Sequence, residues 1–249
     1  MIRQHLFDRR APADPMFRWR GGEVSRVEAL SDAVFAFALT LLVVSLAVPG
    51  TFDDLTHTIR SFPAFAVCFA LLINVWYYHY KFFRRYGLED FPTIVLNGVF
   101  LFVVLFYVYP LKFVFGLLID PLFGVTSAAV AGAPVHPGQL RTMMLFFSAG
   151  FMAISSLLIL LHLRAWQLRS ALELDELERA MTLHSMVTQG VTLGVATTSL
   201  GLAALGGGLL AWSGLIYFLM APLHTLWGWY AGRRAKSIRD RLDRRVGAG

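Results

Sequence analysis

Residues 26–42 read RVEALSDAVFAFALTLL and change abruptly from polar to apolar part-way along. The charged side chains all lie within the first seven positions, and after Asp32 no charged residue appears until Asp53. An uncharged apolar run of about 18 residues or more is long enough to cross the hydrocarbon core of a bilayer as a helix. The stretch therefore predicts a membrane-spanning helix that begins at a polar boundary.

The rest of the chain has the same character. Apolar residues make up 57% of its 249 residues and charged ones 15%, a balance typical of a chain surrounded by lipid rather than water. Between Arg179 and Arg233 there is no charged residue, and the glycines at 206–208 divide this interval into two spans. We predict an all-α integral membrane protein whose single domain, residues 1–249, has six transmembrane helices, at 31–49, 60–83, 91–116, 141–163, 183–204 and 209–231.

The basic residues predict the orientation of these helices. All but three of the 22 lysines and arginines precede the first span, follow the second or the fourth span, or lie beyond the sixth. Because basic residues concentrate on the cytoplasmic side of membrane proteins, we expect both termini in the cytoplasm. Residues 1–25 and 232–249 then form basic cytoplasmic segments. The run RRAKSIRDRLDRR at 233–245 is either a short amphipathic surface helix or a lipid-contacting tail, and we expect the tail.

Two charged features next to the spans have simple interpretations. Lys112 falls near the outer end of the third span, where its ammonium group is expected to reach the lipid headgroups. The segment from Glu173 to Arg179 alternates charges at helical spacing, which predicts that it continues the fourth span as a solvated helix.

Several classes of protein are excluded by the remaining composition. With one cysteine, Cys68, the chain can form neither an internal disulfide nor a C-x-x-C metal site. No nucleic-acid-binding motif accompanies the net charge of +6, so no nucleic acid is expected as a partner. We expect neither an enzyme nor a bound metal or other cofactor, because histidines are isolated from one another and from carboxylates at ligand spacing at positions 57, 136, 162, 184 and 224.

The polar start of the first span has two interpretations. In the first, Ser31 and Asp32 cap the helix by accepting free backbone N–H groups. In the second, the Asp32 carboxylate lies at the membrane boundary and requires a positive partner, for which Arg26 and His79 are the candidates. Antiparallel helices would place His79, from the sequence WYYHYK at the end of the second span, at the same depth as Asp32. On its own, this histidine also fits an interfacial aromatic belt.

The segment from Arg26 to Asp32 resembles the R-x-x-x-F-S-D signature of the transmembrane protein 175 family, cation channels of lysosomes and of prokaryotes. Leu30 stands in place of the phenylalanine, and the apolar run VFAFALTLL that follows is similar as well. The resemblance covers about the first 110 residues and continues through Ser61-Phe62, the W-x-x-H of Trp76 and His79, Asn97 and Pro110.

This resemblance implies a prokaryotic single-repeat channel that assembles as a homotetramer in the plasma membrane, with lipid and potassium ions as its other partners. It also implies a cytoplasmic-side polar network that joins the first two helices and is formed by Arg26, Ser31, Asp32, Trp76 and His79. The first helix of each subunit would line the pore. Its matching face carries the pore residues Phe37, Thr40, Leu41 and Val44, with Phe37, where the family usually has an aliphatic residue, as the narrowest ring.

The same segment predicts how ions would be selected. The chain has no T-V-G-Y-G loop and no acidic residue at mid-membrane, so we expect neither a carbonyl filter nor a carboxylate filter. We predict a potassium-selective, leak-type cation channel with a hydrophobic constriction on the first helix, where Thr40 hydroxyls offset part of the dehydration cost of the ion. The alternatives are a secondary transporter, which requires broken helices or buried charges near the midplane, and a proton-permeable cation pathway.

Overall fold

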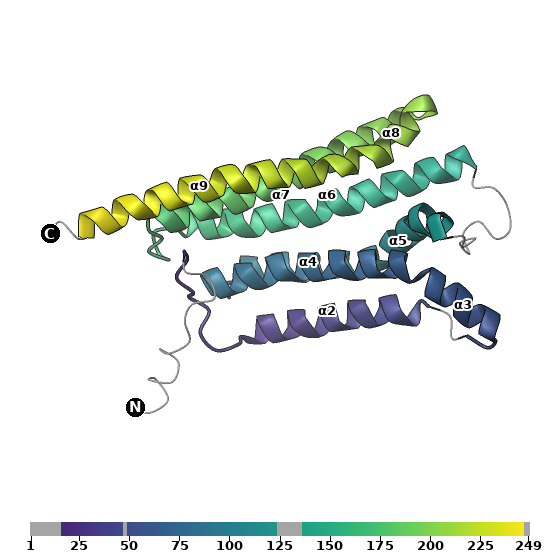
Figure 1. Ribbon diagram of the computed structural model, residues 1–249. Coiled ribbons are helices and arrows are strands. Elements are labelled where there is room, and N and C mark those ends of the chain that lie inside the picture. The colour runs from purple at the N-terminus through teal and green to yellow at the C-terminus, as the bar shows by residue number, and fades with distance from the viewer. Residues whose placement is uncertain (1–15, 47–48, 124–135, 247–249) are drawn as a thin grey trace.

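The computed structural model describes residues 16–46, 49–123 and 136–246. In that part of the chain every regular element is a helix, which confirms the all-α class. The long helices lie side by side along one common direction, and the beginning of the first long helix and the end of the last helix lie at the same end of the bundle (Figure 1). Outside the described part lie residues 1–15 of the predicted N-terminal segment, residues 47–48 of the first predicted span, residues 124–135 between the third and fourth predicted spans, and residues 247–249 of the predicted C-terminal segment.

The helices lie close to the predicted spans, with one addition. α3 was not predicted; it is a short helix whose exposed apolar residues Phe52, Leu55 and Ile59 recur at helical spacing. In chain order the elements are α2 (Arg26–Val44), α3 (Phe52–Arg60), α4 (Phe62–Tyr86), α5 (Phe91–Ile119), the 3-10 turn η1 (Asp120–Phe123), α6 (Pro137–Gln167), α7 (Glu176–Leu205), the 3-10 turn η2 (Gly207–Leu209), α8 (Leu210–Leu215), the 3-10 turn η3 (Ile216–Leu219) and α9 (Met220–Val246).

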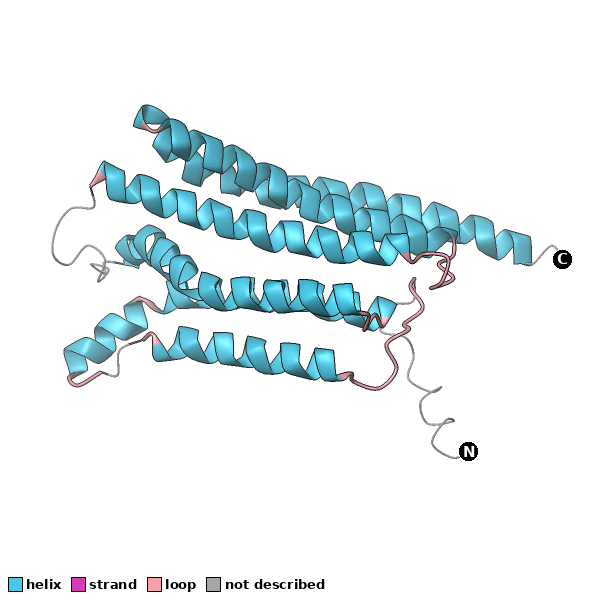
Figure 2. Cartoon of the chain, turned by 180° about the vertical axis from the view of Figure 1, so that it is seen from behind, coloured by secondary structure: helices cyan, strands magenta, loops and turns pink. Residues whose placement is uncertain are grey.

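Five described segments are long and apolar enough to cross a membrane, namely α2, α4, α5, α6 and residues 207–244. The expected fifth span lies in α7, which has 30 residues but is less apolar because it contains Gln189 together with several threonines and glycines. α7 nevertheless packs along α6 and α9 within the bundle (Figure 2). The fold is therefore that of a multi-pass helical membrane protein.

The first span begins earlier than predicted. α2 starts at Arg26, and the Ser25 hydroxyl accepts a hydrogen bond from the backbone N–H of Glu28 while the Glu28 carboxylate accepts one from the backbone N–H of Ser25. This reciprocal pair is a capping box, which satisfies two backbone donors at once. Ser31 and Asp32 therefore lie inside the helix, and the interpretation of these two residues as its caps is wrong.

The last predicted span, 209–231, is not one regular helix. Pro222 lies in the first turn of α9, and a proline can neither donate a backbone N–H nor fit against the carbonyl four residues earlier. The chain responds by tightening into η3 just before it. The residues that flank η3, Leu215 and Met220, keep right-handed helical dihedral angles, so the chain continues in the same direction.

α9 then continues as a helix to Val246. Ala235 and Ile238 are buried and pack against Leu177 of α7, and Arg241 lies 3.7 Å from the Glu176 carboxylate. The helical alternative for residues 233–245 is therefore the one that the structure supports, whereas we expected the lipid-contacting tail.

A cluster of ion pairs and tight backbone contacts joins the segments at the end of the bundle where α2 begins and α9 ends. Arg20 donates to the Glu178 carboxylate at 2.9 Å, and Arg164 donates to Asp90 at 2.9 Å. The segment from Glu173 to Arg179 does not continue the fourth span, because α6 ends at Gln167 and Glu173 has a φ of 49°, so the chain turns before α7 begins. These contacts attach the N-terminal segment and the start of α5 to the α6–α7 turn.

α5 and α6 cross closely in the centre of the bundle. The Tyr107 ring is buried directly over Gly150, and its hydroxyl donates to the carbonyl of Phe147 at 2.8 Å. A methyl group at position 150 would overlap the ring. Gly150 has an ordinary helical backbone, so glycine is required at this crossing for lack of space and not for its conformational freedom.

Replacing Gly150 with alanine should destabilise the protein by about 1–3 kcal/mol, because the buried and hydrogen-bonded Tyr107 ring cannot move aside without loss. Thermal unfolding of purified protein measures this. Gly98→Ala, on the exposed side of α5 with no atom within 4 Å of the added carbon, is the matched control and should be neutral or slightly stabilising. Equal melting temperatures for the two variants would contradict the tight crossing.

The Glu178 contacts predict a dependence of stability on pH. Burial raises the pKa of this carboxyl, but hydrogen bonds from Arg20 and from the backbone N–H groups of Asp175 and Arg18 outweigh it, so the pKa is lowered from 4.5. A group whose pKa is depressed in the folded state stabilises the fold above its unfolded pKa, and that contribution is lost as the pH falls through its folded pKa. The melting temperature should therefore fall below about pH 4.5.

Glu178→Gln should remove part of that fall, because an amide does not titrate. Glu173→Gln is the control, since Glu173 is exposed and lies 3.7 Å from an equally accessible Arg18. Between pH 7 and pH 3 the melting temperature should fall less steeply with pH for the Glu178 variant than for the control. Identical slopes would count against a stabilising Glu178 carboxylate.

Candidate functional site

α2 packs through one face and leaves the other uncovered. Its buried residues follow each other at three- and four-residue intervals, which marks a single stripe along the helix; they are Glu28, Ser31, Phe35, Ala38 and Leu42. This stripe contacts α4 and α5. Figure 1 shows α2 at the edge of the bundle, with no helix on its outer side.

The opposite face carries three of the four predicted pore residues. Phe37 is 54% exposed and Val44 71%, and Thr40 between them is exposed as well. Leu41, the fourth, is half-buried and packs against the core, so it lies at the border of this face. The Thr40 hydroxyl donates to the carbonyl of Ala36 at 2.8 Å, which uses its proton and leaves the oxygen lone pairs directed outward.

A chain of buried hydrogen bonds joins α2, α4 and α5. The His79 Nε2–H donates to the Asn97 side-chain carbonyl at 2.7 Å, and the Asn97 amide donates to the Ser31 hydroxyl at 3.0 Å. Ser31 in turn donates to the backbone carbonyl of Val27 at 2.7 Å. All three side chains are at most 2% exposed, and each donor in the chain has an acceptor. We call His79, Asn97 and Ser31 the polar anchor.

Aromatic rings enclose the polar anchor. The His79 ring stacks on Phe100 with ring centroids 5.3 Å apart and an interplanar angle of 10°, and it also contacts Phe35 and Phe83. These rings exclude water from the hydrogen bonds, which strengthens the bonds and makes the loss of either partner costly.

The predicted network residues divide into two separate groups. Asp32 does not pair with Arg26 or His79 in the described structure; its carboxylate accepts a hydrogen bond from the Trp76 indole N–H at 2.8 Å. His79 and Ser31 belong instead to the polar anchor. Arg26 is exposed and has no hydrogen bond or ion pair to any other described residue. The carboxylate at the membrane boundary is therefore satisfied by a neutral donor rather than by a cation.

Asn97 is the member of the anchor that our network left out. The sequence does carry a signal for it, because an asparagine within the apolar run TIVLNGVFLF is costly in a membrane helix unless it has buried partners. Glu28 was overlooked as well; besides closing the capping box, its carboxylate lies 3.9 Å from Arg84 of α4.

A second polar contact holds the other end of α2. Lys112 of α5 donates to the backbone carbonyl of Ser45, the residue that caps the C-terminus of α2. A cation at this position complements the negative end of the helix dipole. The contact replaces the lipid-headgroup role that we expected for Lys112.

Comparison with known proteins identifies the chain. A potassium channel of Marivirga tractuosa is 35% identical over 245 residues, which cover 94% of this chain and 98% of that protein. Residues 26–107 match the family described as the endosomal/lysosomal potassium channel TMEM175. The chain belongs to the TMEM175 family.

Other members agree with this assignment. A potassium channel of Chamaesiphon minutus is 33% identical over 118 residues, 44% of this chain and 58% of that protein. The crystal structure of a variant of the potassium channel MtTMEM175, bound to a nanobody–MBP fusion, superposes with a TM-score of 0.77 at 35% identity and covers 90% of this chain and 100% of that one. The TMEM175 homologue from Chamaesiphon minutus, described as a lysosomal potassium-selective channel homologue, shares the fold at 24% identity with a TM-score of 0.54, over 84% of this chain and 98% of that one.

The residues that match the TMEM175 family contain the whole polar anchor and the exposed face of α2. This confirms the resemblance inferred from Arg26, Ser31 and Asp32. The curated relatives are prokaryotic, and this TMEM175 protein is accordingly a multi-pass protein of the plasma membrane.

Replacing Asn97 with leucine should destabilise this TMEM175 protein by about 1–3 kcal/mol, because the buried His79 donor loses its acceptor. Asn74→Leu makes the same exchange at an exposed position of α4 and is the control. Thermal unfolding of the two variants in detergent should give a clearly lower melting temperature for the Asn97 variant. If both variants unfold at the same temperature, the buried hydrogen bonds contribute nothing to stability.

Proposed function

We propose that the protein is a potassium-selective, leak-type channel in which four subunits place α2 around a central pathway. The uncovered face of α2 carries this proposal, because the side of the helix that holds Phe37, Thr40 and Val44 is not covered by the rest of its own subunit. Family membership supports it, since a relative that aligns with 94% of this chain is named a potassium channel.

The uncovered face suits a constriction. Phe37, Thr40 and Val44 follow each other at three- and four-residue intervals, so their side chains form successive layers about 5 Å apart along a helix axis. Phe37 supplies an apolar ring that would be hard to wet, and Thr40 supplies oxygen atoms one layer further out. Leu41 belongs to the same segment but is half-buried against the core, so in this proposal it supports the constriction from the side.

Selectivity in such a pathway depends on the cost of removing water from the ion. An apolar ring provides no ligands, so the ion keeps as much of its hydration shell as the radius permits. The outward lone pairs of four Thr40 hydroxyls would replace some of the lost water. Potassium is more weakly hydrated than sodium and would pass at lower cost.

We further propose that α7 crosses the membrane as the fifth of six spans and that both termini are cytoplasmic. α7 has the length for a full crossing, and its polar side chains are buried or bonded within the helix. Gln189 is 5% exposed, and Ser199 is fully buried with its hydroxyl 2.8 Å from that of Ser148 on α6. The exposed Thr197 and Thr198 donate to backbone carbonyls of α7 itself. A helix that hides its polar side chains against a neighbour can remain in lipid.

Arg20, Arg84 and Arg164 form ion pairs with Glu178, Glu28 and Asp90 at the end of the bundle where α4 and α6 end and α2, α5 and α7 begin. This clustering agrees with the positive-inside rule.

One charged residue of α2, Arg26, supports the formation of a homotetramer. Arg26 lies eleven residues before Phe37, about three helical turns, and therefore on the same uncovered face. An arginine at the membrane boundary without a partner in its own described chain fits a helix that meets further copies of the protein.

Reconstitution in liposomes tests this function and separates it from the alternatives. Potassium flux without a coupling ion, greater than sodium and proton flux, is the expected result. Flux that requires a gradient of a second substrate would identify a transporter, and dominant proton flux would identify a proton pathway.

Replacing Phe37 with alanine should raise potassium conductance and lower the preference for potassium over sodium, because the apolar ring becomes wider and wetter. Phe146→Ala is the matched control, since Phe146 is 61% exposed but belongs to α6 rather than to α2. Currents and reversal potentials in planar bilayers measure both effects. Unchanged permeation in the Phe37 variant would remove α2 from the pathway.

A further inference from the structure

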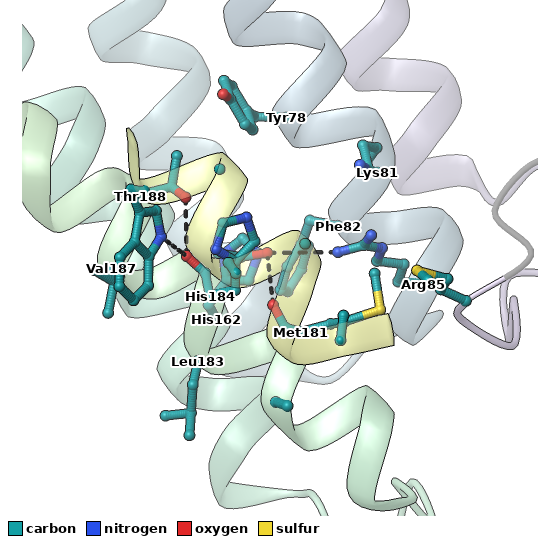
Figure 3. A pocket seen from close by; sticks show the side chains of 18 of the residues that line it. Tyr78, Lys81, Phe82, Arg85, His162, Met181, Leu183, His184, Val187 and Thr188 are labelled. Atoms are coloured by element: carbon teal, nitrogen blue, oxygen red, sulfur yellow. Dashed lines mark hydrogen bonds between the residues drawn. The ribbon is translucent and has the colours of Figure 1, made fainter. Parts of the chain in front are cut away.

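A cavity outside the polar anchor and the uncovered face of α2 opens between α4, α7 and α9. Its volume is about 790 Å³, and its lining includes residues of the N-terminal segment and His162 of α6. Figure 3 shows side chains of α4 on one side and of α7 on the other, facing the same space. A cavity of this size can hold a substantial part of a small ligand.

The lining has one sign of charge. Lys81, Arg85 and Arg234 are cationic, and no acidic residue is among the described residues that line the cavity. Arg85 is buried, lies 3.4 Å from the Ser185 hydroxyl, and places its guanidinium 4.8 Å from the centre of the Phe17 ring. A concave, partly apolar wall with three cations favours an anionic ligand.

The cavity wall carries cations and apolar side chains side by side. Along α4, Lys81 and Arg85 come after Tyr77, and along α9, Arg234 comes after Trp227. Their depths overlap, because Arg85 lies 3.4 Å from the Ser185 hydroxyl and the adjacent His184 ring stacks on Trp227. Val187 extends the apolar wall along α7. The distance along α4 from Tyr77 to Arg85 is about 12 Å.

Polar atoms that lack partners are also present in the wall. The His184 Nδ1 is buried and has no hydrogen-bond partner among the described residues, while its ring stacks on Trp227 at 5.6 Å between centroids. A buried polar atom without a partner is costly unless a ligand or water supplies one.

We propose that this cavity binds an anionic glycerophospholipid. The phosphate lies between Lys81, Arg85 and Arg234, a hydroxyl of the headgroup reaches His184, and the start of the acyl chains follows the apolar wall towards Val187. A soluble anion would use only the cations, and a neutral lipid only the apolar part of the wall. The site is independent of the proposed potassium pathway, because it shares no residue with the uncovered face of α2.

Native mass spectrometry of protein released from detergent tests the proposal. The probes are phosphatidylglycerol, phosphatidylcholine with the same acyl chains, and glycerol phosphate. Phosphatidylglycerol should bind more tightly than either of the other two. Lys81→Gln and Arg234→Gln should each weaken its binding about fivefold, since one basic residue near an anionic lipid contributes ~1 kcal/mol.

Two further variants keep the test decisive. Lys236 lies on α9, as Arg234 does, but it is exposed and does not line the cavity. Lys236→Gln should therefore leave lipid binding unchanged. Thr188→Phe fills the cavity without changing charge and should abolish binding. Equal binding of the two lipids, equal effects of Arg234→Gln and Lys236→Gln, or glycerol phosphate binding as tightly as the lipid would each overturn the proposal. The proposal would also be overturned if Thr188→Phe changed the number of subunits in the assembly but left lipid binding normal. In that case a second copy of the chain, and not a lipid, would cover the cavity.

Discussion

Two polar side chains of α5 hold α2 at both of its ends, and this double attachment sets the position of the rest of α2. Asn97 binds Ser31 near the start of α2, and Lys112 binds the carbonyl of Ser45 at its end. Fifteen residues separate the two contacts on α5 and fourteen on α2, which is about 22 Å and 21 Å of helix. The near-equal lengths mean that the two parallel helices cannot slide by one turn without losing both contacts.

The uncovered face of α2 depends on this register. Between the two attachments, apart from the Asp32–Trp76 hydrogen bond beside the first one, the residues of α2 that meet α5 and α4 are apolar, among them Phe35, Ala38 and Leu42. Apolar packing alone gives little register in a membrane, because lipid tails are as apolar as the side chains they replace. The hydrogen bonds at the two ends therefore decide the rotation of α2 about its axis, and with it the side on which Phe37 and Thr40 emerge.

Much of the architecture follows from hydropathy, whereas the contacts do not. The helical class and approximate spans were predictable because the bilayer requires long uncharged segments whose backbone groups bond internally. The separation of Asp32 from Arg26 was not, since depth in the membrane places residues at one level without saying which of them touch. Ser25 and Glu28 show the opposite case, because their capping-box spacing is visible in the sequence and we passed over it. The turn at Glu173 and the tightening before Pro222 also depend on local backbone geometry, which average hydropathy does not report.

The polar groups of a single subunit are largely satisfied before any assembly takes place. His79, Asn97 and Ser31 bond one another, Asp32 accepts from Trp76, and Thr40 donates to its own helix. The face that remains therefore offers apolar side chains and hydroxyl lone pairs within the hydrocarbon and Arg26 at the membrane boundary, a surface that lipid tolerates at little cost. In the channel that we propose, a subunit can thus rest in the membrane on its own, and the wet pathway comes into being only when four such faces meet. The lone pairs of Thr40 then gain a function that they lack in lipid, because water and ions reach them only in the assembled state.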